Sequence, residues 1–160
     1  MASNRHLGRI VALKALYEYD FRLRAADPDA DIEEIISRNL IRYTKTIDDM
    51  AFVEGLIRGV ATNIEKLDDK IRPLAPDWPL DQISRIDHAI LRLSLYELFD
   101  MSDSGIPSKV TINEAVELAK SFGAEKSSKF INGVLGTAWR QANPNDESAK
   151  KPVKKEQEDA

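Results

Sequence analysis

The 160-residue sequence contains no cysteine, which excludes disulfide bonds, thiolate zinc sites and cysteine nucleophiles. A chain without cysteine is compatible with a reducing compartment, and we expect a cytoplasmic protein. No apolar run approaches the roughly 20 residues that a membrane-spanning helix needs. The first residues, MASNRHLGR, also lack the apolar core of a signal peptide. We therefore expect no contact with a membrane.

Motifs for catalysis and metal binding are also missing. The only histidines are His6 and His88, and the sequence has no H-E-x-x-H, phosphate-binding loop or G-x-S-x-G. His88 lies in IDHAIL beside the apolar stripe, which favours a hydrogen-bonded interface histidine over a catalytic base. The aspartates of 27–31 resemble the start of a calcium loop, but Ile32 replaces the required glycine and Arg38 the final glutamate. We expect no enzyme, metal or cofactor.

Charge is present but unevenly distributed, and the net charge is −4. Residues 1–24 carry 5 basic and 2 acidic side chains (5 − 2 = +3), and residues 109–140 carry 5 and 3 (5 − 3 = +2). Residues 25–108 carry 9 basic and 17 acidic side chains (9 − 17 = −8). If the two basic segments meet in the fold, they form a local positive surface that attracts phosphates. The alternative is that both are ordinary solvated helix faces.

Apolar residues recur at helical spacing along the chain, and no segment alternates as a strand does. The pattern predicts an all-α fold of about seven helices. The long apolar face from Val53 to Ile71 predicts one continuous helix of five turns. Within it, the spacing of Gly55 and Gly59 indicates close approach of a neighbouring helix. The main helices are expected at about 5–24, 31–45, 46–71, 82–100, 111–122 and 127–141.

Several residues indicate where helices begin and end. Asp31 precedes IEEII and is expected to cap a helix. Thr111 and Glu114 match a capping box, which predicts a helix start there. Gly123 follows that helix, in the position that favours a positive φ. Trp78, in the proline-rich PLAPDWPL, is expected to be buried between two halves of the molecule.

These boundaries predict one folded domain at 5–141. It divides into subdomains at about 5–72 and 79–141. The segment after Gln141 has one large apolar residue, Val153, and we expect residues 142–160 to form a disordered tail.

The start of the last helix has the residue types of an RNA-binding surface. Lys126 and Lys129 can neutralise phosphates, and Phe130 can stack on an unpaired base. The N-terminus of a helix also favours anions. Cationic groups recur near the start of the first helix, at Arg5, His6 and Arg9. The alternative for Phe130 is a place in the core, because its position in the apolar pattern is ambiguous.

Two segments resemble a known family. RIDHAILRLSLYEL and IPSKVTINEAVELAKSFGAEKSSKFINGVLG closely resemble the bacterial transcription antitermination factor NusB, and a weaker match runs from Arg9 to Asp20. The resemblance covers about residues 5–140. It implies an all-helical, non-enzymatic factor that pairs with the small-subunit ribosomal protein NusE and binds boxA RNA of nascent ribosomal transcripts. It further implies assembly with other Nus factors on RNA polymerase.

The resemblance also implies roles for single residues. Two departures stand out: the N-terminal segment is less rich in arginine than in some members, and Lys126 stands where some members have an acid. A lysine there is expected to favour RNA. The implied RNA contacts are Arg5, His6, Arg9, Lys129 and Phe130, to which we add Lys126 for its charge. The implied contacts with the protein partner are Tyr17 and Asp87.

Other functions remain open from the sequence. NusB-like domains also occur fused to RNA methyltransferases, but no cofactor-binding α/β pattern follows residue 141, so we do not expect that enzyme. A second alternative is a scaffold that binds protein and never RNA. We also expect that an exposed partner surface could support a homodimer when the partner is absent.

Overall fold

The computed structural model describes residues 2–145, with side chains from residue 5 onward, and its elements are all helical. The predicted all-α fold with about seven helices is confirmed. No helix in the described range is long and apolar enough to cross a membrane. The α-helices are α1 (Ala2–Arg24), α2 (Ile32–Leu40), α3 (Met50–Thr62), α4 (Ile64–Leu74), α5 (Arg85–Leu95), α6 (Ser108–Phe122) and α7 (Ser127–Ala142).

Short turns of other helix types connect these elements. The 3₁₀ turns are η1 (Ile41–Tyr43), η2 (Leu80–Gln82) and η4 (Ser102–Ser104), and η3 (Tyr96–Asp100) is a π-helical turn that continues α5. Helix α7 ends at Ala142, the first residue of the predicted tail, and residues 143–145 follow it outside any helix. The rest of that tail, 146–160, lies outside the described residues.

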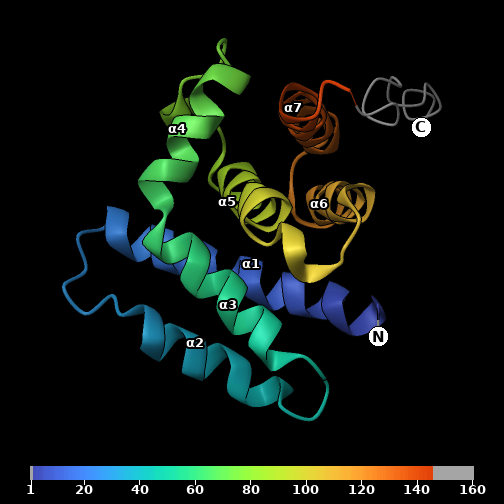
Figure 1. The fold of residues 1–160 in the computed structure, drawn as a ribbon. Helices are drawn as coiled ribbons and strands as arrows, with labels where there is room; N and C mark the ends of the chain where they lie inside the picture. The colour runs from blue at the N-terminus through green and yellow to red at the C-terminus, as the bar shows by residue number, and fades with distance from the viewer. Residues whose placement is uncertain (1, 146–160) are drawn as a thin grey trace.

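Helix α5 lies at the centre of the molecule (Figure 1). It contacts α1, α3, α4, α6 and α7, while α6 packs most extensively against α7 and α1 against α3. Every residue from Asp87 to Leu95 is buried. The buried apolar side chains form one cluster, which runs from Val11 in α1 to Ala138 in α7. The division into two subdomains stays a prediction.

Polar residues of α5 pair with partners on other helices, although Asp87 Oδ1 and His88 Nδ1 are buried without a hydrogen-bond partner in the described part of the chain. His88 is 1% exposed, and its Nε2 lies 2.7 Å from Asp68 Oδ1 in α4. Arg92 donates through Nε and Nη2 to the same carboxylate, both at 2.9 Å, and through Nη1 to Asp20 of α1 at 3.2 Å. Burial raises the pKa of Asp68, but hydrogen bonds from His88 and Arg92 outweigh it and lower that pKa to about 2. The predicted hydrogen bond of His88 is present, but the residue lies in the interior rather than at an interface.

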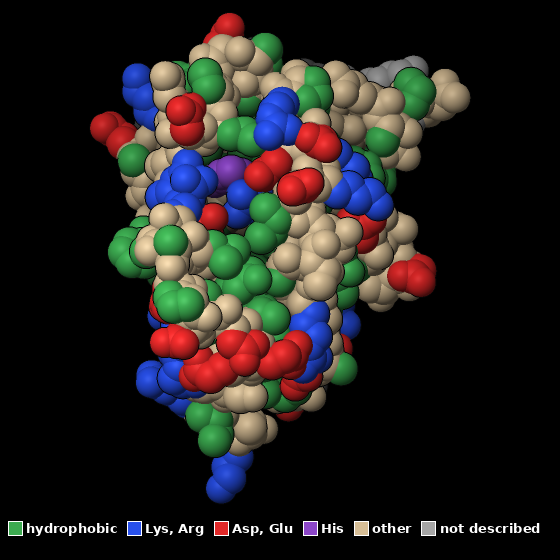
Figure 2. Space-filling view, turned by 90° about the vertical axis from the view of Figure 1, so that its left-hand side faces the viewer, with side chains coloured by type: hydrophobic (Ala, Val, Ile, Leu, Met, Phe, Trp, Pro, Cys, Tyr) green, Lys and Arg blue, Asp and Glu red, His purple; other side chains and the backbone are tan. Residues whose placement is uncertain are grey.

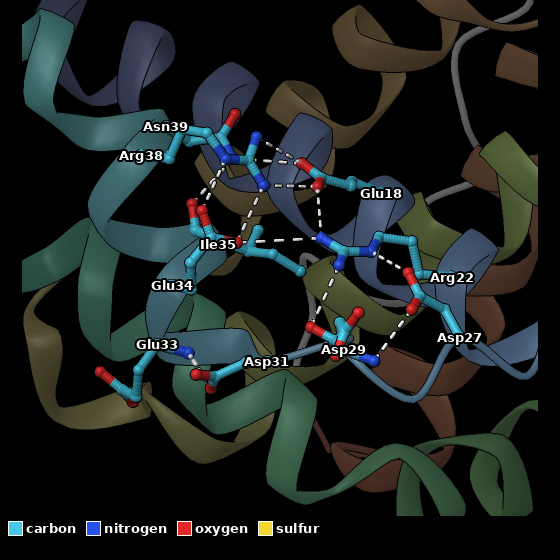
Figure 3. A network of polar contacts seen from close by, with 10 residues as sticks. All are labelled: Glu18, Arg22, Asp27, Asp29, Asp31, Glu33, Glu34, Ile35, Arg38 and Asn39. Carbon is cyan, nitrogen blue, oxygen red and sulfur yellow. Dashed lines mark hydrogen bonds and ion pairs between the residues drawn. The ribbon is translucent and has the colours of Figure 1, made fainter.

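The connection from α1 to α2 is held by ion pairs on the surface (Figure 3). Glu18 accepts from Arg38 at 2.6 Å and from Arg22 at 3.1 Å, and Arg22 also donates to Asp27 at 2.7 Å. Asp31 accepts from the backbone N–H of Glu33, which confirms its predicted capping role. The aspartates of 27–31 therefore serve ion pairs and helix capping. No cluster suited to a metal occurs among residues 2–145.

The predicted continuous helix from about 46 to 71 is wrong, because the structure has two helices there. Asn63 separates α3 from α4 with φ −125° and ψ 26°. Its side-chain Nδ2 donates to the carbonyl oxygen of Gly59 at 2.7 Å, which satisfies a group left free at the end of α3. The apolar period continues across the break because both helices bury the same side against the core.

Three further predictions of local structure are wrong. Helix α6 begins at Ser108, so Thr111 and Glu114 are not a capping box and instead contact other helices. Gly123 has φ −94°, and a Cβ there would lie 2.6 Å from Ser127 Cβ. The glycine is therefore explained by close packing rather than by a positive φ. Trp78 is 53% exposed and is not a buried plug.

The Asp68 cluster predicts a pH-dependent stability. Asp68→Asn is expected to lower the free energy of unfolding by about 2 kcal/mol at neutral pH, since the pKa falls from 3.8 to about 2 on folding. Because the folded pKa is depressed, this contribution is present above about pH 4 and is lost as the pH falls towards 2. Urea unfolding across this range tests it, with the exposed neighbour Asp69→Asn as control. If the difference in free energy of unfolding between the wild type and Asp68→Asn does not change with pH, the interpretation is contradicted.

The two glycines of α3 predict opposite effects of alanine. A Cβ on Gly59 would lie 2.0 Å from the Tyr96 ring, whereas a Cβ on Gly55 meets nothing within 4 Å. Gly59→Ala is expected to destabilise the protein by about 1–3 kcal/mol through overpacking. Gly55→Ala is expected to stabilise it by roughly 0.5–1 kcal/mol, because glycine is a poor helix former. Thermal unfolding of both variants measures these changes. If alanine acted only through its higher helix propensity, both variants would be more stable than the wild type.

Candidate nucleic-acid interface

A groove of about 480 Å³ lies where α7 begins. Its lining comes from the loop before α5, the first turn of α5, the turn between α6 and α7, and the first turn of α7. The residues that line it are Trp78, Gln82, Ile83, Ser84, Asp87, Ala124, Lys126, Ser127, Lys129 and Phe130. The fold therefore places three of the predicted RNA contacts, Lys126, Lys129 and Phe130, around one groove.

The two lysines of this groove are available to a ligand. Lys126 and Lys129 are exposed, and neither forms an ion pair within the described part of the chain. Phe130 is partly buried, since it packs against the core while it lines the groove. Phe130 therefore belongs both to the edge of the core and to the surface of the groove. Two free cations at a helix N-terminus, beside an aromatic ring, can hold a phosphate and a base.

Asp87 lies at the same groove and is 8% exposed. Its backbone N–H donates to Ser84 Oγ at 3.1 Å, and its Oδ2 accepts from Ser127 Oγ at 3.0 Å. Its other oxygen, Oδ1, is buried and has no hydrogen-bond partner within residues 2–145. Asp87 was expected at a protein interface, but the structure places it with the predicted RNA contacts.

Arg9 lies in the interior and is 3% exposed. Its guanidinium donates to Glu97 through Nε at 2.9 Å and through Nη2 at 2.5 Å, which is a two-bonded ion pair. Thr111 donates to the same carboxylate at 3.3 Å. This ion pair positions α1 against η3, and the Arg9 side chain also lines the cavity beside Arg5. The predicted contact of Arg9 with RNA stays a prediction.

Arg5 and His6 are only partly exposed, and both have partners. Arg5 Nη2 lies 3.3 Å from Asp49 Oδ2, and its guanidinium lies over the Phe52 ring, 4.7 Å from the centroid. His6 Nδ1 lies 2.6 Å from Glu114 Oε1. Arg5 also lines a second cavity of about 370 Å³ beside the start of α6. These contacts reduce the positive charge that the first basic segment offers to a ligand.

The two basic segments, 1–24 and 109–140, do meet, since His6 lies 2.6 Å from Glu114 and Lys14 Nζ lies 6.0 Å from the Phe122 ring centroid. Arg5 and His6 nevertheless do not lie beside Lys126 and Lys129, so the expected single positive surface is wrong. Ser127 of α7 contacts Asp87 at the start of α5, whereas Arg9 of α1 contacts Glu97 beyond its end. Ten residues of helix separate these positions, which is about 15 Å along the axis. Arg5 and His6 lie at the Glu97 end, and the groove lies at the other.

Tyr17 belongs to an exposed apolar stripe on α1. Tyr17 is 39% and Phe21 63% exposed, and both share a face of the helix with Lys14. Lys14 Nζ lies 6.0 Å from the ring of Phe122, which is 39% exposed at the end of α6. Exposed aromatic side chains on neighbouring helices are typical of protein-binding surfaces. Tyr17 is therefore accessible to a partner.

The view of the side that carries α4 and the end of α1 shows apolar side chains at its centre, with acidic and basic side chains above and below (Figure 2). A patch with a polar rim is the usual anatomy of a binding surface.

The sequence interpretation missed Trp78, Phe21 and Phe122 as surface residues. A helical period marks positions on a face but does not show whether another element covers that face. Trp78 lies in a turn between the two prolines of PDWP, where its backbone N–H donates to the carbonyl oxygen of Ala75 at 3.0 Å, and no pattern in the sequence marks its ring as exposed.

The fold and this surface define an all-helical binding protein with a lysine- and aromatic-lined groove. A family model described as the NusB family matches residues 6–140, and the chain belongs to that family. It is 40% identical to the transcription antitermination protein NusB of Chloroflexus aggregans, over 89% of this chain and 95% of that protein. It is also 40% identical to the protein of that name from Dehalococcoides mccartyi, over 86% of this chain and 90% of that protein.

Solved structures have the same fold. The chain resembles T. maritima NusB with a TM-score of 0.73 and 33% identity, over 98% of this chain and 97% of that one. It also resembles a chain from a structure of antitermination factors NusB and NusE in complex with double-stranded RNA, with a TM-score of 0.74 and 23% identity, over 88% and 99%. At that identity the second likeness supports the fold alone.

Two arginines of α1 are predicted to differ sharply in their effect on stability. Arg9→Ala leaves Glu97 buried without its ion pair, and we expect a loss of about 3–5 kcal/mol in the free energy of unfolding. Arg5→Ala removes a partly exposed pair and is expected to cost at most about 1 kcal/mol. Denaturant unfolding of both variants measures this. Similar small losses would show that Arg9 does not hold α1 in place.

Proposed function

We propose that this protein is a transcription antitermination factor that binds boxA-type RNA together with the ribosomal protein NusE. The names of its relatives and its membership of the NusB family support this function. The observation that carries the RNA part is the groove at the start of α7, where Lys126 and Lys129 lack ion pairs beside Phe130. The protein acts by binding, and no catalytic step is assigned to it.

RNA binding at the groove combines two kinds of contact. The lysines neutralise phosphates and release counterions, which gives affinity without sequence preference. The aromatic rings of Phe130 and Trp78 offer surfaces on which unpaired bases stack. Arg5 and His6, beside the other end of α5, are a second contact for a longer RNA. The contact of Arg9 with RNA stays a prediction, because its side chain is buried.

The protein partner is proposed to dock on the apolar stripe of Tyr17 and Phe21, with Phe122 beside it. A structure of NusB and NusE with RNA among the structural neighbours motivates the choice of NusE. The acidic middle of the chain suits a basic ribosomal protein. Asp87 is not included, because it is buried at the groove.

The partner surface and the groove are neighbours in the fold. Phe122 ends α6 at the partner surface, and Ala124, two residues later, lines the groove. A protein docked on Tyr17 and Phe122 therefore lies next to a bound RNA and can share it. We propose that the partner binds first and that the two proteins then form a joint RNA surface.

The wider assembly follows from this function. The complex is proposed to join other Nus factors and RNA polymerase in the cytoplasm, on nascent ribosomal transcripts. The exposed aromatic stripe also suits a homodimer when the partner is absent, since two copies could cover the same apolar surface. Co-purification with NusE, and the mass of the protein alone, test both states.

Replacing both groove lysines is expected to weaken RNA binding. Lys126→Ala with Lys129→Ala should lower the slope of log affinity against log salt by about 1.4, from about 0.7 for each phosphate contact on a single strand. Fluorescence anisotropy with labelled boxA RNA at several salt concentrations measures the slope. Lys45→Ala with Lys66→Ala removes the same charge from exposed positions outside the groove. Equal slopes for the two double variants would contradict the proposed site.

An acidic residue in the apolar stripe is expected to reduce partner binding. Tyr17→Asp places a charge where the partner buries aromatic surface, and we expect at least about tenfold weaker NusE binding. RNA binding by the protein alone should be unchanged. Ile41→Asp, at an apolar position that is 70% exposed, is the matched control. Calorimetric titration with NusE measures both, and unchanged affinity for Tyr17→Asp would place the partner elsewhere.

A further inference from the structure

We propose that the outer ridge of α7 is a track for the backbone of a longer RNA, and that it leads away from the groove as far as Arg140. The inference rests on the proposed RNA-binding function and extends it along the whole helix. Residues at spacings of three and four lie on one side of a helix, and here that side is opposite the buried residues of α7. The ridge consists of Lys126, Lys129, Gly133, Gly136, Thr137 and Arg140.

The ridge carries positive charge that no acid on the same helix offsets. Residues 126–143 contain no Asp or Glu. Its three cations, Lys126, Lys129 and Arg140, are exposed and form no ion pair within the described part of the chain. Other arginines of the fold, such as Arg9 and Arg92, are bound to carboxylates. The outer face of α7 therefore offers a row of cations that a polyanion can neutralise.

The side chain of Arg140 is oriented along the ridge. Its Nη2 donates to Thr137 Oγ1 at 3.2 Å, and its Nη1 lies 3.2 Å from the position that a Cβ on Gly136 would take. The guanidinium thus lies back over the preceding turn, in space that a glycine leaves, rather than against the last carbonyls of the helix. It makes no other hydrogen bond to residues 5–145, so most of its planar fork of donors is available to a phosphate.

A second glycine keeps the middle of the ridge low. Gly133 is exposed, and a Cβ there would meet nothing within 4 Å. Glycine inside a helix costs about 0.5–1 kcal/mol relative to alanine, and packing within the described residues does not require it at this position. A helix surface without a side chain lets a sugar–phosphate strand approach closely between Lys129 and Arg140.

The ridge covers the distance between the two ends of α5. Helix α7 begins against the first turn of α5 and ends against η3, where Trp139 stacks on Phe99 with the ring centroids 6.1 Å apart. From Lys129 to Arg140 the ridge is about 16 Å long, at 1.5 Å for each residue. A strand that leaves the groove along it reaches the end of α5 at which the first basic segment lies.

An acidic segment of another protein is the competing occupant, since it would also be attracted by these cations. The composition of the ridge argues against it. Protein interfaces rely on large apolar or aromatic anchors, whereas the ridge between Lys129 and Arg140 offers two glycines and a threonine. The ring of Trp139 is stacked on Phe99. The continuity of the ridge with the lysines of the groove favours a nucleic acid.

The test uses the full-length protein and oligouridine strands of roughly five and fifteen nucleotides, of which only the longer one covers groove and ridge together. Fluorescence anisotropy at several salt concentrations measures binding. Arg140→Ala should lower the slope of log affinity against log salt by about 0.7 for the long strand and leave the short strand unchanged. Arg42→Ala is the matched control, because Arg42 is exposed in η1 and has no ion pair within the described residues.

Two substitutions at Gly133 separate charge from shape. Gly133→Glu places an acid in the middle of the ridge and should weaken the long strand by about fivefold, whereas Gly133→Lys should strengthen it by a similar factor. Both side chains have open space, and thermal unfolding verifies that both variants fold. An effect of bulk alone would give both variants the same sign, which overturns the proposal.

The outcomes also separate this inference from the function on which it rests. If Arg140→Ala and both Gly133 variants leave the long strand unchanged while Lys126 and Lys129 still matter, the track is overturned and RNA binding stands. If these variants change binding of a polyglutamate peptide but not of RNA, the ridge belongs to an acidic protein partner and the track is overturned as well. If neither strand binds, with or without NusE, the proposed RNA function itself fails.

Discussion

The structure depends on how the buried helix α5 satisfies its polar side chains. Burying a charge is costly unless it is paired, and α5 with its π-helical extension buries several. The partners come from three helices, α1, α4 and α7, so a shift of any one of them would leave a buried polar group unpaired. The arrangement therefore fixes the positions of three helices around one. The pairs are Asp87 with Ser127, His88 with Asp68, Arg92 with Asp68 and Asp20, and Glu97 with Arg9.

The same constraint divides the cations of the protein into two groups. Arginines such as Arg9, Arg22 and Arg92 form multiple bonds to carboxylates and hold helices together, as their planar fork of donors favours. Lys126 and Lys129 form no ion pair within the described residues, whereas Lys120 pairs with Glu117 at 3.7 Å. At the groove, the charge that a ligand meets is therefore set by lysine. A count of basic residues along the chain overstates the positive surface near the N-terminus.

The helical period predicted the fold class and most helix positions, because an apolar face and its burial are both local properties. The break at Asn63 was not predictable from the period, since both helices bury the same side. Of the candidate site, Lys126, Lys129 and Phe130 do lie together, as adjacent residues on one helical turn must. The depth of Arg9 depends on Glu97, which is 88 residues away. Neither that pairing nor the exposure of Trp78 has a local signature.

The contact between Gly59 and Tyr96 has a consequence for how this sequence can change over generations. The two residues lie in different helical elements, yet the ring occupies the space that any side chain at 59 would need. A larger residue at 59 is tolerated only after 96 has become smaller, whereas a smaller residue at 96 leaves a void that favours replacement of the glycine. The two positions are therefore expected to change together or not at all, and their joint variation among relatives would record how closely α3 approaches the end of α5.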